Sequence, residues 1–125
     1  MKKIILVFVL VVSVLLAHDF GNVPEIKFSQ IKKGKPFMIM VGKTKCIWCD
    51  SMAPQIKEIK EQYPKTKIYY INVDKDFLGA VNNNIVELPV QLFYNKKGKE
   101  VARHIGYMGK KDILAYLREY GVLVE

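Results

Sequence analysis

Cys46 and Cys49 are the only two cysteines of the chain, and two residues separate them. Two thiols at this spacing on a helix lie one turn apart, close enough to form a disulfide. Reversible disulfide exchange needs an accessible thiolate that attacks and a second thiol that resolves the mixed disulfide. We therefore predict that Cys46 is the nucleophile and that Cys49 is the resolving thiol.

The residues on either side of the cysteines predict a strand followed by a helix. Residues 36–41 form a short apolar run that is typical of a buried strand. From residue 52 onward, apolar residues recur at helical spacing, which indicates a helix that continues to about Gln62 and is kinked at Pro54. Cys46 then lies at the N-terminus of this helix, where unpaired N–H groups and the helix dipole stabilise a thiolate.

The rest of the chain alternates between predicted strands and helices. Three further strands are expected at residues 67–73, 90–94 and 100–105. Two further helices are expected at about residues 75–83 and 110–120. A strand–helix–strand unit pairs in parallel, whereas two strands joined by a short turn pair antiparallel. The sequence therefore predicts an α/β fold with a central mixed β-sheet and helices on both faces.

Three details of these elements are also predicted. Asp74 is expected to cap the helix at residues 75–83. The apolar side chains of this helix, those of Phe77, Leu78 and Val81, are expected to face the core. His104, in the last strand, is expected to lie at the surface.

The first seventeen residues have the layout of a secretory signal peptide. A basic start at Lys2 and Lys3 precedes an apolar run that ends at Ala17. Cleavage after Ala17 would release a soluble domain at residues 18–125, and an uncleaved segment would anchor that domain to the membrane. Either outcome predicts an exported, periplasmic protein, in a compartment where disulfides form and persist.

Composition narrows the classes of ligand. The chain carries a formal net charge of +8, but it has no arginine-rich run or alternation of basic and aromatic residues, so a nucleic-acid surface is not predicted. A zinc site needs about four ligands. The two thiols and the distant His18 and His104 do not supply them at a suitable spacing. We expect no cofactor and no metal site.

Four features resemble the thioredoxin-like family. They are the C-x-x-C at the strand-to-helix junction, Pro54 eight residues after Cys46, Leu88-Pro89-Val90 before the hairpin strand, and Gly106 after it. Together with the apolar start, they make the chain similar to the exported, periplasmic thiol–disulfide oxidoreductases of that family.

The resemblance implies a thioredoxin fold over the whole body of the chain. It also implies that Pro89 follows a cis peptide bond and faces the dithiol, which would leave the backbone of Leu88 available to an extended substrate segment. Trp48 is expected either to cover the site and contact a partner or to be a packing residue. We therefore predict that Trp48, Leu88 and Pro89 bind substrate.

Three positions depart from the pattern of cytosolic thioredoxins. Met40 stands where those proteins carry a buried acid, Tyr70 where they carry its lysine partner, and Gly42 where a tryptophan is common. The usual device that deprotonates the buried cysteine is therefore absent. Water or Glu87 is the expected substitute.

The predicted function is reduction or reshuffling of disulfides in client proteins by a dithiol that a membrane electron donor keeps reduced. No histidine lies between the cysteines, and this absence favours a mild or reducing couple. One alternative is a disulfide-forming oxidase. The other is a non-enzymatic protein whose dithiol holds a partner or a metal such as copper, with Met38 or Met40 as a further ligand.

Overall fold

The computed structural model describes residues 20–125, so the predicted signal peptide lies outside the described residues. The elements are η1 (Phe28–Gln30), β1 (Phe37–Gly42), α1 (Ile47–Gln62), β2 (Ile68–Asn72), α2 (Phe77–Asn82), β3 (Val90–Tyr94), β4 (Glu100–Ile105) and α3 (Lys110–Glu119). Within residues 20–125, no helix combines the length and the apolar character needed to cross a membrane.

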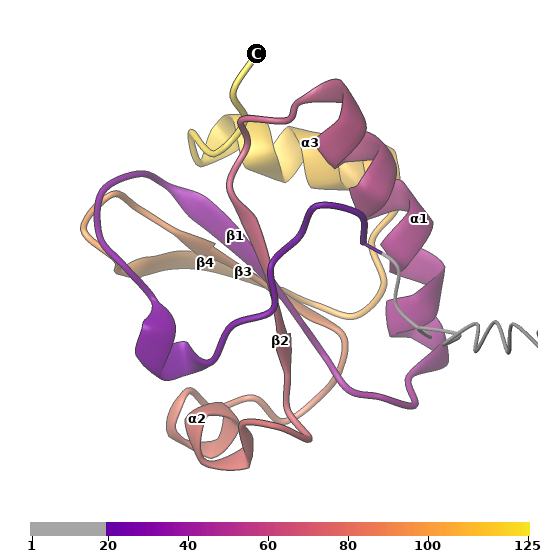
Figure 1. The fold of residues 1–125 in the computed structure, drawn as a ribbon, viewed down its shortest axis with the longest axis vertical. Coiled ribbons are helices and arrows are strands. Elements are labelled where there is room, and N and C mark those ends of the chain that lie inside the picture. Colours follow the sequence, from indigo (N-terminus) through magenta and orange to yellow (C-terminus); the bar gives the residue numbers. More distant parts are fainter. Residues whose placement is uncertain (1–19) are drawn as a thin grey trace, which may run out of the picture.

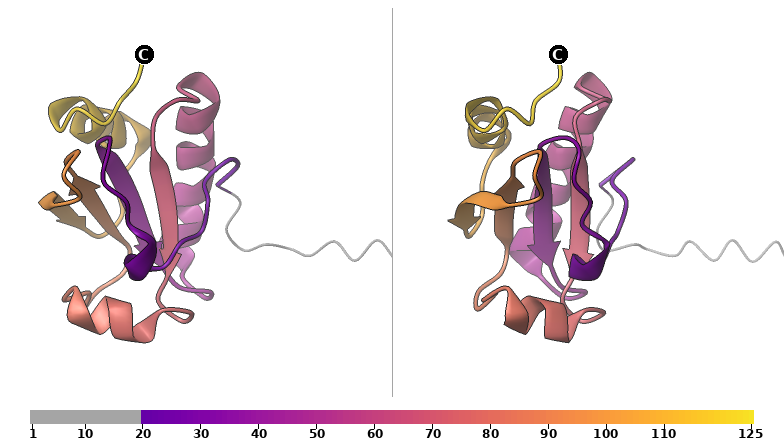
Figure 2. Two further views of the ribbon diagram at one scale, coloured as in Figure 1. Left: turned by 60° about the vertical axis from the view of Figure 1, so that its left-hand side comes forward. Right: turned by 90° about the vertical axis from the view of Figure 1, so that its left-hand side faces the viewer.

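The four strands, labelled in Figure 1, form one mixed sheet in the order β2-β1-β3-β4, and Figure 2 shows them side by side. β1 runs parallel to β2, and β3 pairs antiparallel with both β1 and β4. The helix α1 is the crossover that connects the parallel strands β1 and β2, and β3 and β4 form an antiparallel hairpin, as the lengths of the connections predicted. The predicted α/β class and mixed sheet are confirmed.

The side chains of β1 separate two apolar cores, one on each face of the sheet. Met38 and Met40 pack with buried residues of α1 and α3. Ile39 and Val41 face the other side, in the cluster that holds Ala80 of α2 and a phenylalanine of η1. Alternation along a strand explains this division, because successive side chains point to opposite faces. Figure 2 shows α1 and α3 on one side of the sheet, with η1 away from them.

The short helix α2 differs from its prediction in its cap and in its buried face. Its N-cap is Asp76, whose Oδ1 accepts a hydrogen bond from the Gly79 N–H at 3.2 Å, while Oδ2 accepts one from the Phe28 N–H at 2.8 Å. Asp74, the predicted cap, instead accepts a hydrogen bond from the Thr44 N–H.

The prediction that the apolar side chains of α2 face the core is wrong. Phe77, Leu78 and Val81 are all exposed, and Ala80 is the buried residue of this helix. Asp76 ties the start of α2 to η1, and that contact turns Ala80 toward the sheet.

A buried amide links β3 to β4. Gln91 is fully buried, and its Nε2 donates to the carbonyl of Gly106 at 3.1 Å. The same nitrogen lies 3.3 Å from the sulfur of Met52. Nδ1 of His104 is 2.7 Å from the other end of the amide, Gln91 Oε1. His104 is half-buried in this contact, so its prediction as a surface residue is wrong.

Tyr94 gives the fold a dependence on alkaline pH. Burial, with a smaller contribution from Glu100, raises the pKa of Tyr94 to about 12 from its ordinary value of 10.0. Between those two values the unfolded chain loses this proton and the folded chain keeps it, so stability falls as pH rises through the window.

Replacement of this tyrosine tests the effect. In Tyr94→Phe, the fall in the free energy of unfolding across the window should be shallower by up to about 1.4 kcal/mol per pH unit. Urea denaturation of variant and parent, at matched pH values below and inside the window, measures the difference. Parallel curves for the two proteins would contradict the assignment.

Candidate active site around the Cys46–Cys49 disulfide

Three connections of the chain, β1–α1, β2–β3 and β4–α3, meet at one edge of the sheet. The parallel strands β1 and β2 both end there, since Gly42 pairs with Asn72. β3 begins at the same edge, because Val90 pairs with Val41, and β4 ends there opposite Val90. The segment after β1 holds Cys46, the connection from β2 to β3 holds α2 and Leu88, and the segment after β4 holds Tyr107. These residues are thereby brought together.

The two cysteines form a disulfide at the start of α1. Their Cα atoms are 5.2 Å apart, and their sulfurs are bonded. Cys46 is the N-cap of the helix, and its Sγ accepts a hydrogen bond from the Cys49 N–H at 3.2 Å. Cys46 is 9% exposed and Cys49 is 0% exposed, so an incoming sulfur can reach Cys46 alone.

The position of Cys46 suits an attacking thiolate. In the reduced protein, the first free N–H groups of α1 and the positive end of its dipole point toward this sulfur and favour its anion. Lys43 and Lys45 line the same surface as Cys46 and add positive potential. The buried Cys49, one turn along the helix, can attack only a partner that is already bound to Cys46.

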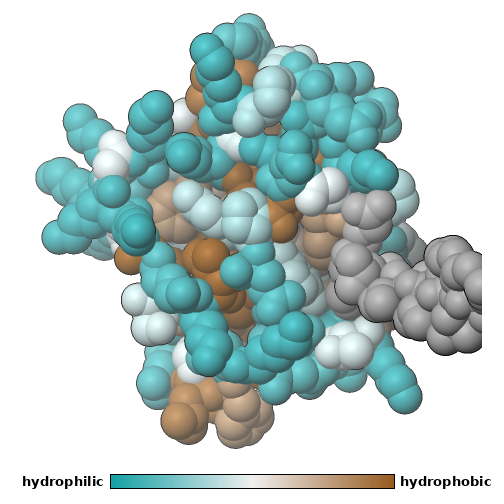
Figure 3. All heavy atoms as spheres, viewed as in Figure 1, coloured by the Kyte–Doolittle hydropathy of each residue, from teal (hydrophilic) through white to brown (hydrophobic). Residues whose placement is uncertain are grey.

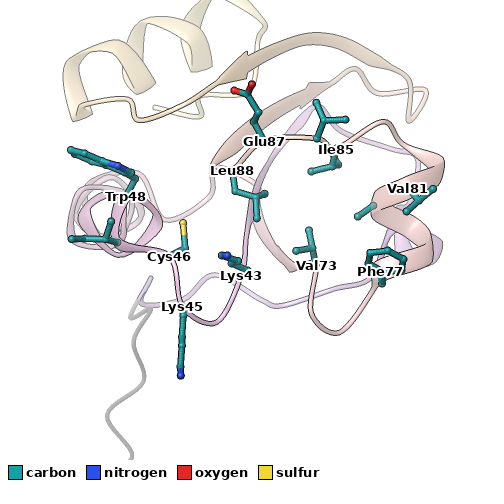
Figure 4. A pocket seen from close by; sticks show the side chains of 13 residues that line it. Lys43, Lys45, Cys46, Trp48, Val73, Phe77, Val81, Ile85, Glu87 and Leu88 are labelled. Carbon is teal, nitrogen blue, oxygen red and sulfur yellow. The ribbon is translucent and has the colours of Figure 1, made fainter.

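A hollow of about 470 Å³ opens beside Cys46. Trp48 and Leu88 line it together with the sulfur, as Figure 4 shows, so two of the three predicted substrate-binding residues lie at its wall. The third, Pro89, is buried and does not line it. The Leu88–Pro89 peptide bond is cis, the isomer that the resemblance implied.

Tyr107 is a neighbour of the site that sequence reasoning missed. Its ring lies 6.0 Å from that of Trp48, and its hydroxyl contacts the side-chain amide of Gln55 on α1. Tyr107 directly follows Gly106, whose place in the family pattern was the only signal for this segment. Trp48 itself is 58% exposed, and Tyr107 supports one side of it.

Gly42 leaves room for the side chains of Cys49 and Tyr70, which both lie close to it. A Cβ atom at Gly42 would lie 2.9 Å from the Sγ of Cys49 and 3.2 Å from the ring of Tyr70. A tryptophan at this position would displace both groups. Burial, reinforced by the charges of nearby carboxylates, raises the pKa of Tyr70, so its hydroxyl stays neutral.

At the two strand positions where cytosolic thioredoxins carry a buried acid and its lysine partner, this chain carries Met40 and Tyr70. Met40 and Tyr70 pair across β1 and β2 at the two relevant positions, and both are buried. Glu87 lines the hollow, but Figure 4 shows its carboxylate directed away from Cys46. Among residues 20–125, no cluster of three or more histidine, cysteine or acidic side chains is placed to hold a metal ion.

Substitution of Gly42 tests this packing. Gly42→Ala should lower the free energy of unfolding of the oxidised protein by about 1–3 kcal/mol, because the bonded Cys49 sulfur cannot move away from the new methyl group. The reduced protein should lose less, since its Cys49 side chain can rotate. Urea denaturation in both redox states measures the two losses. Equal denaturation midpoints for variant and parent would show that this close approach carries no strain.

Comparisons with known proteins agree with this geometry. A model of the thioredoxin-like domain matches residues 28–121. Thioredoxin-1 of Saccharomyces cerevisiae is 35% identical over 78 residues, which are 62% of this chain and 75% of the yeast protein.

Two solved structures share the fold at lower identity. One is the oxidised form of mitochondrial thioredoxin 3 from Saccharomyces cerevisiae, with a TM-score of 0.68 and 18% identity over 78% of this chain and 94% of that one. The other comes from work on thiol resolution in yeast mitochondrial 1-Cys peroxiredoxin. It has a TM-score of 0.70 and 15% identity over 81% of this chain and 98% of that one. The chain therefore belongs to the thioredoxin-like family, and its Cys46–Cys49 pair is that of a thiol–disulfide oxidoreductase.

Proposed function

We propose that the protein is exported and that its dithiol reduces or reshuffles disulfides in client proteins. The observation that carries this proposal is the arrangement of the two sulfurs. Cys46 borders an open hollow at a helix N-terminus, and Cys49 is sealed behind it. Such an arrangement presents one sulfur to clients and reserves the other for resolution.

The reaction has two balanced steps. The Cys46 thiolate attacks one sulfur of a client disulfide, and a mixed disulfide forms as the other client sulfur leaves as a thiolate. The Cys49 sulfur, having lost its proton to solvent, then attacks the Sγ of Cys46 and releases the second client thiolate. Two electrons pass to the client, and a membrane-bound dithiol donor must reduce the Cys46–Cys49 disulfide for the next cycle.

Serine substitutions separate the two roles. Cys46→Ser should abolish reduction of a protein disulfide, because no nucleophile remains at the surface. Cys49→Ser should form the first bond but fail to release it, so client proteins should accumulate in mixed disulfides with Cys46. Mass spectrometry of the trapped complexes identifies the linked residues. Trapping through Cys49 in the Cys46→Ser protein would reverse the assignment.

The reduction potential separates a reductase from the oxidase alternative. Ile47 and Trp48 lie between the cysteines, so no histidine ring there can donate a hydrogen bond to the thiolate. We expect a potential nearer to that of cytosolic thioredoxins, about −270 mV, than to the strongly oxidising end near −120 mV. Equilibration of the purified protein with glutathione buffers measures it. A value at the oxidising end would favour disulfide formation in clients.

Export rests on the basic and apolar start of the chain. Cleavage after Ala17 should give a mature protein that begins at His18, and the intact mass of protein recovered from the periplasmic fraction measures this. A full-length mass in the membrane fraction would instead support the anchored form. Recovery in the cytosolic fraction would overturn the proposal of export.

A further inference from the structure

Three segments of the chain meet at the edge of the sheet opposite the disulfide. β1 and β2 both begin there, since Met38 pairs with Ile68. β3 ends and β4 begins at the same edge, where Tyr94 pairs with Phe37 of β1 and with Glu100 of β4. The segment before β1, the segment before β2 and the turn from β3 to β4 are therefore neighbours in the fold.

These three segments are rich in lysine. Residues 31–36, 63–67 and 95–99 hold three, two and three lysines respectively and no acidic residue. Every one of these lysines is exposed. Figure 3 shows hydrophilic side chains projecting on the left, where Figure 1 places the β3–β4 turn and the segment before β1. We call the three segments together the basic end of the protein.

Direct contacts join the three segments into one surface. The N–H of Gly34 donates to the carbonyl of Lys96 at 2.8 Å, which holds the first segment against the β3–β4 turn. Lys35, on the other side of Gly34, lines a hollow of about 270 Å³ together with Lys65 and Lys67 of the second segment. The lysines are thus continuous across the whole edge.

Lys60 of α1 forms the inner wall of this hollow. Its Nζ donates to the carbonyls of Thr66 at 2.7 Å and Pro64 at 3.0 Å. Burial, with a further contribution from the charge of Lys67, lowers the pKa of Lys60. A negatively charged group in the hollow would therefore relieve repulsion between these amines.

The carboxylates next to the basic end oppose little of its charge. Glu100 accepts a hydrogen bond from Arg103 at 2.8 Å, and Glu125 lies 3.6 Å from Arg118. Glu61, in the last turn of α1, adjoins the second segment. The basic end therefore carries a large excess of positive charge at the edge of the sheet that is farthest from the reactive sulfur.

The composition of the basic end favours a lipid surface over a folded partner. Protein interfaces are enriched in arginine and exposed aromatic residues and depleted in lysine. The three segments have no arginine, and Tyr63, their one aromatic residue, is half-buried. Lysine is a hydrated point charge on a flexible stem, and clusters of lysines bind the scattered headgroups of anionic bilayers.

We propose that the basic end attaches the protein reversibly to the anionic headgroups of a lipid bilayer and leaves Cys46 directed away from the bilayer. The inference goes beyond the proposed function, because the attachment involves neither cysteine. The two are compatible, since attachment would keep the protein close to a membrane that holds its electron donor.

The test measures binding to lipid vesicles by co-sedimentation. The protein begins at His18, so its apolar start contributes nothing, and it keeps the whole sheet and both apolar cores that a domain needs to fold by itself. One set of vesicles is phosphatidylcholine alone, and the other is phosphatidylcholine mixed with the anionic phosphatidylglycerol. Sodium chloride is varied in both.

Two variants with the same net charge locate the binding surface. The first replaces one exposed lysine of each segment of the basic end, namely Lys33→Gln, Lys67→Gln and Lys97→Gln. The matched control replaces three exposed lysines outside the basic end, namely Lys27→Gln, Lys75→Gln and Lys111→Gln. Urea denaturation of both variants checks that they are folded.

The parent should bind the anionic vesicles and not the neutral ones, and added salt should release it because salt screens exposed charges. The first variant should bind about a hundredfold more weakly, since each lysine near an anionic surface strengthens binding about fivefold. The control should lose much less. Vesicle-bound protein should reduce a small soluble disulfide as fast as free protein does, because Cys46 remains accessible.

Other results would overturn the inference in distinguishable ways. Equal binding to both kinds of vesicle, or equal losses in the two variants, would show that the basic end is not the attachment surface. Binding to polyglutamate or to DNA without binding to vesicles would identify an acidic macromolecule as its partner. Slower reduction of the small disulfide on vesicles would refute the orientation. A protein that binds anionic vesicles but reduces no disulfide would refute the proposed function alone.

Discussion

The hydrogen bond from the Cys49 N–H to the Sγ of Cys46 joins the start of α1 to the reactive group. Helices usually begin at an oxygen-bearing residue that accepts such a bond. Here the cap is the sulfur that exchanges, so its charge changes during the reaction. A thiolate accepts a hydrogen bond more strongly than a disulfide sulfur, and the helix end is therefore most stable when Cys46 is ready to attack. The local fold and the redox state are coupled at this one atom.

Two uncharged residues lie beside the second sulfur, although nearby carboxylates contribute to the raised pKa of one of them, Tyr70. Gly42 and Tyr70 enclose Cys49, and the methionine at position 40 pairs with Tyr70 across the strands. Cys49 is 0% exposed, so its sulfur acts only on a client that is already bound to Cys46. The chain has thus replaced a buried charge pair by close packing, and this packing depends on the missing side chain at Gly42.

Much of this arrangement could be predicted from the sequence, because the signals were local. The apolar run before Cys46 and the helical spacing after it fixed the position of the sulfur at a strand-to-helix junction. The mixed sheet followed from the lengths of the connections. The assignment of Met38 and Met40 to the core, rather than to a metal, is consistent with their complete burial.

The errors arose where long-range contacts decide the outcome. Nothing near Asp76 in the sequence indicates that its carboxylate also binds the backbone of Phe28, 48 residues away. That contact orients α2, so the apolar periodicity of Phe77 and Val81 predicted burial where the structure has exposure. The pairing of Trp48 with Tyr107 likewise depends on the sheet order, which brings the end of β4 beside the start of α1.

The amide of Gln91 determines which tautomer His104 adopts. Its nitrogen donates to the Gly106 carbonyl, so its oxygen is the end that faces the imidazole and must receive a proton from it. Nδ1 of His104 therefore carries hydrogen, and Nε2 holds the lone pair in the neutral ring. The imidazolium also donates from Nδ1, so uptake of a proton leaves this bond intact. Strands β3 and β4 stay joined through this contact in either charge state of the ring.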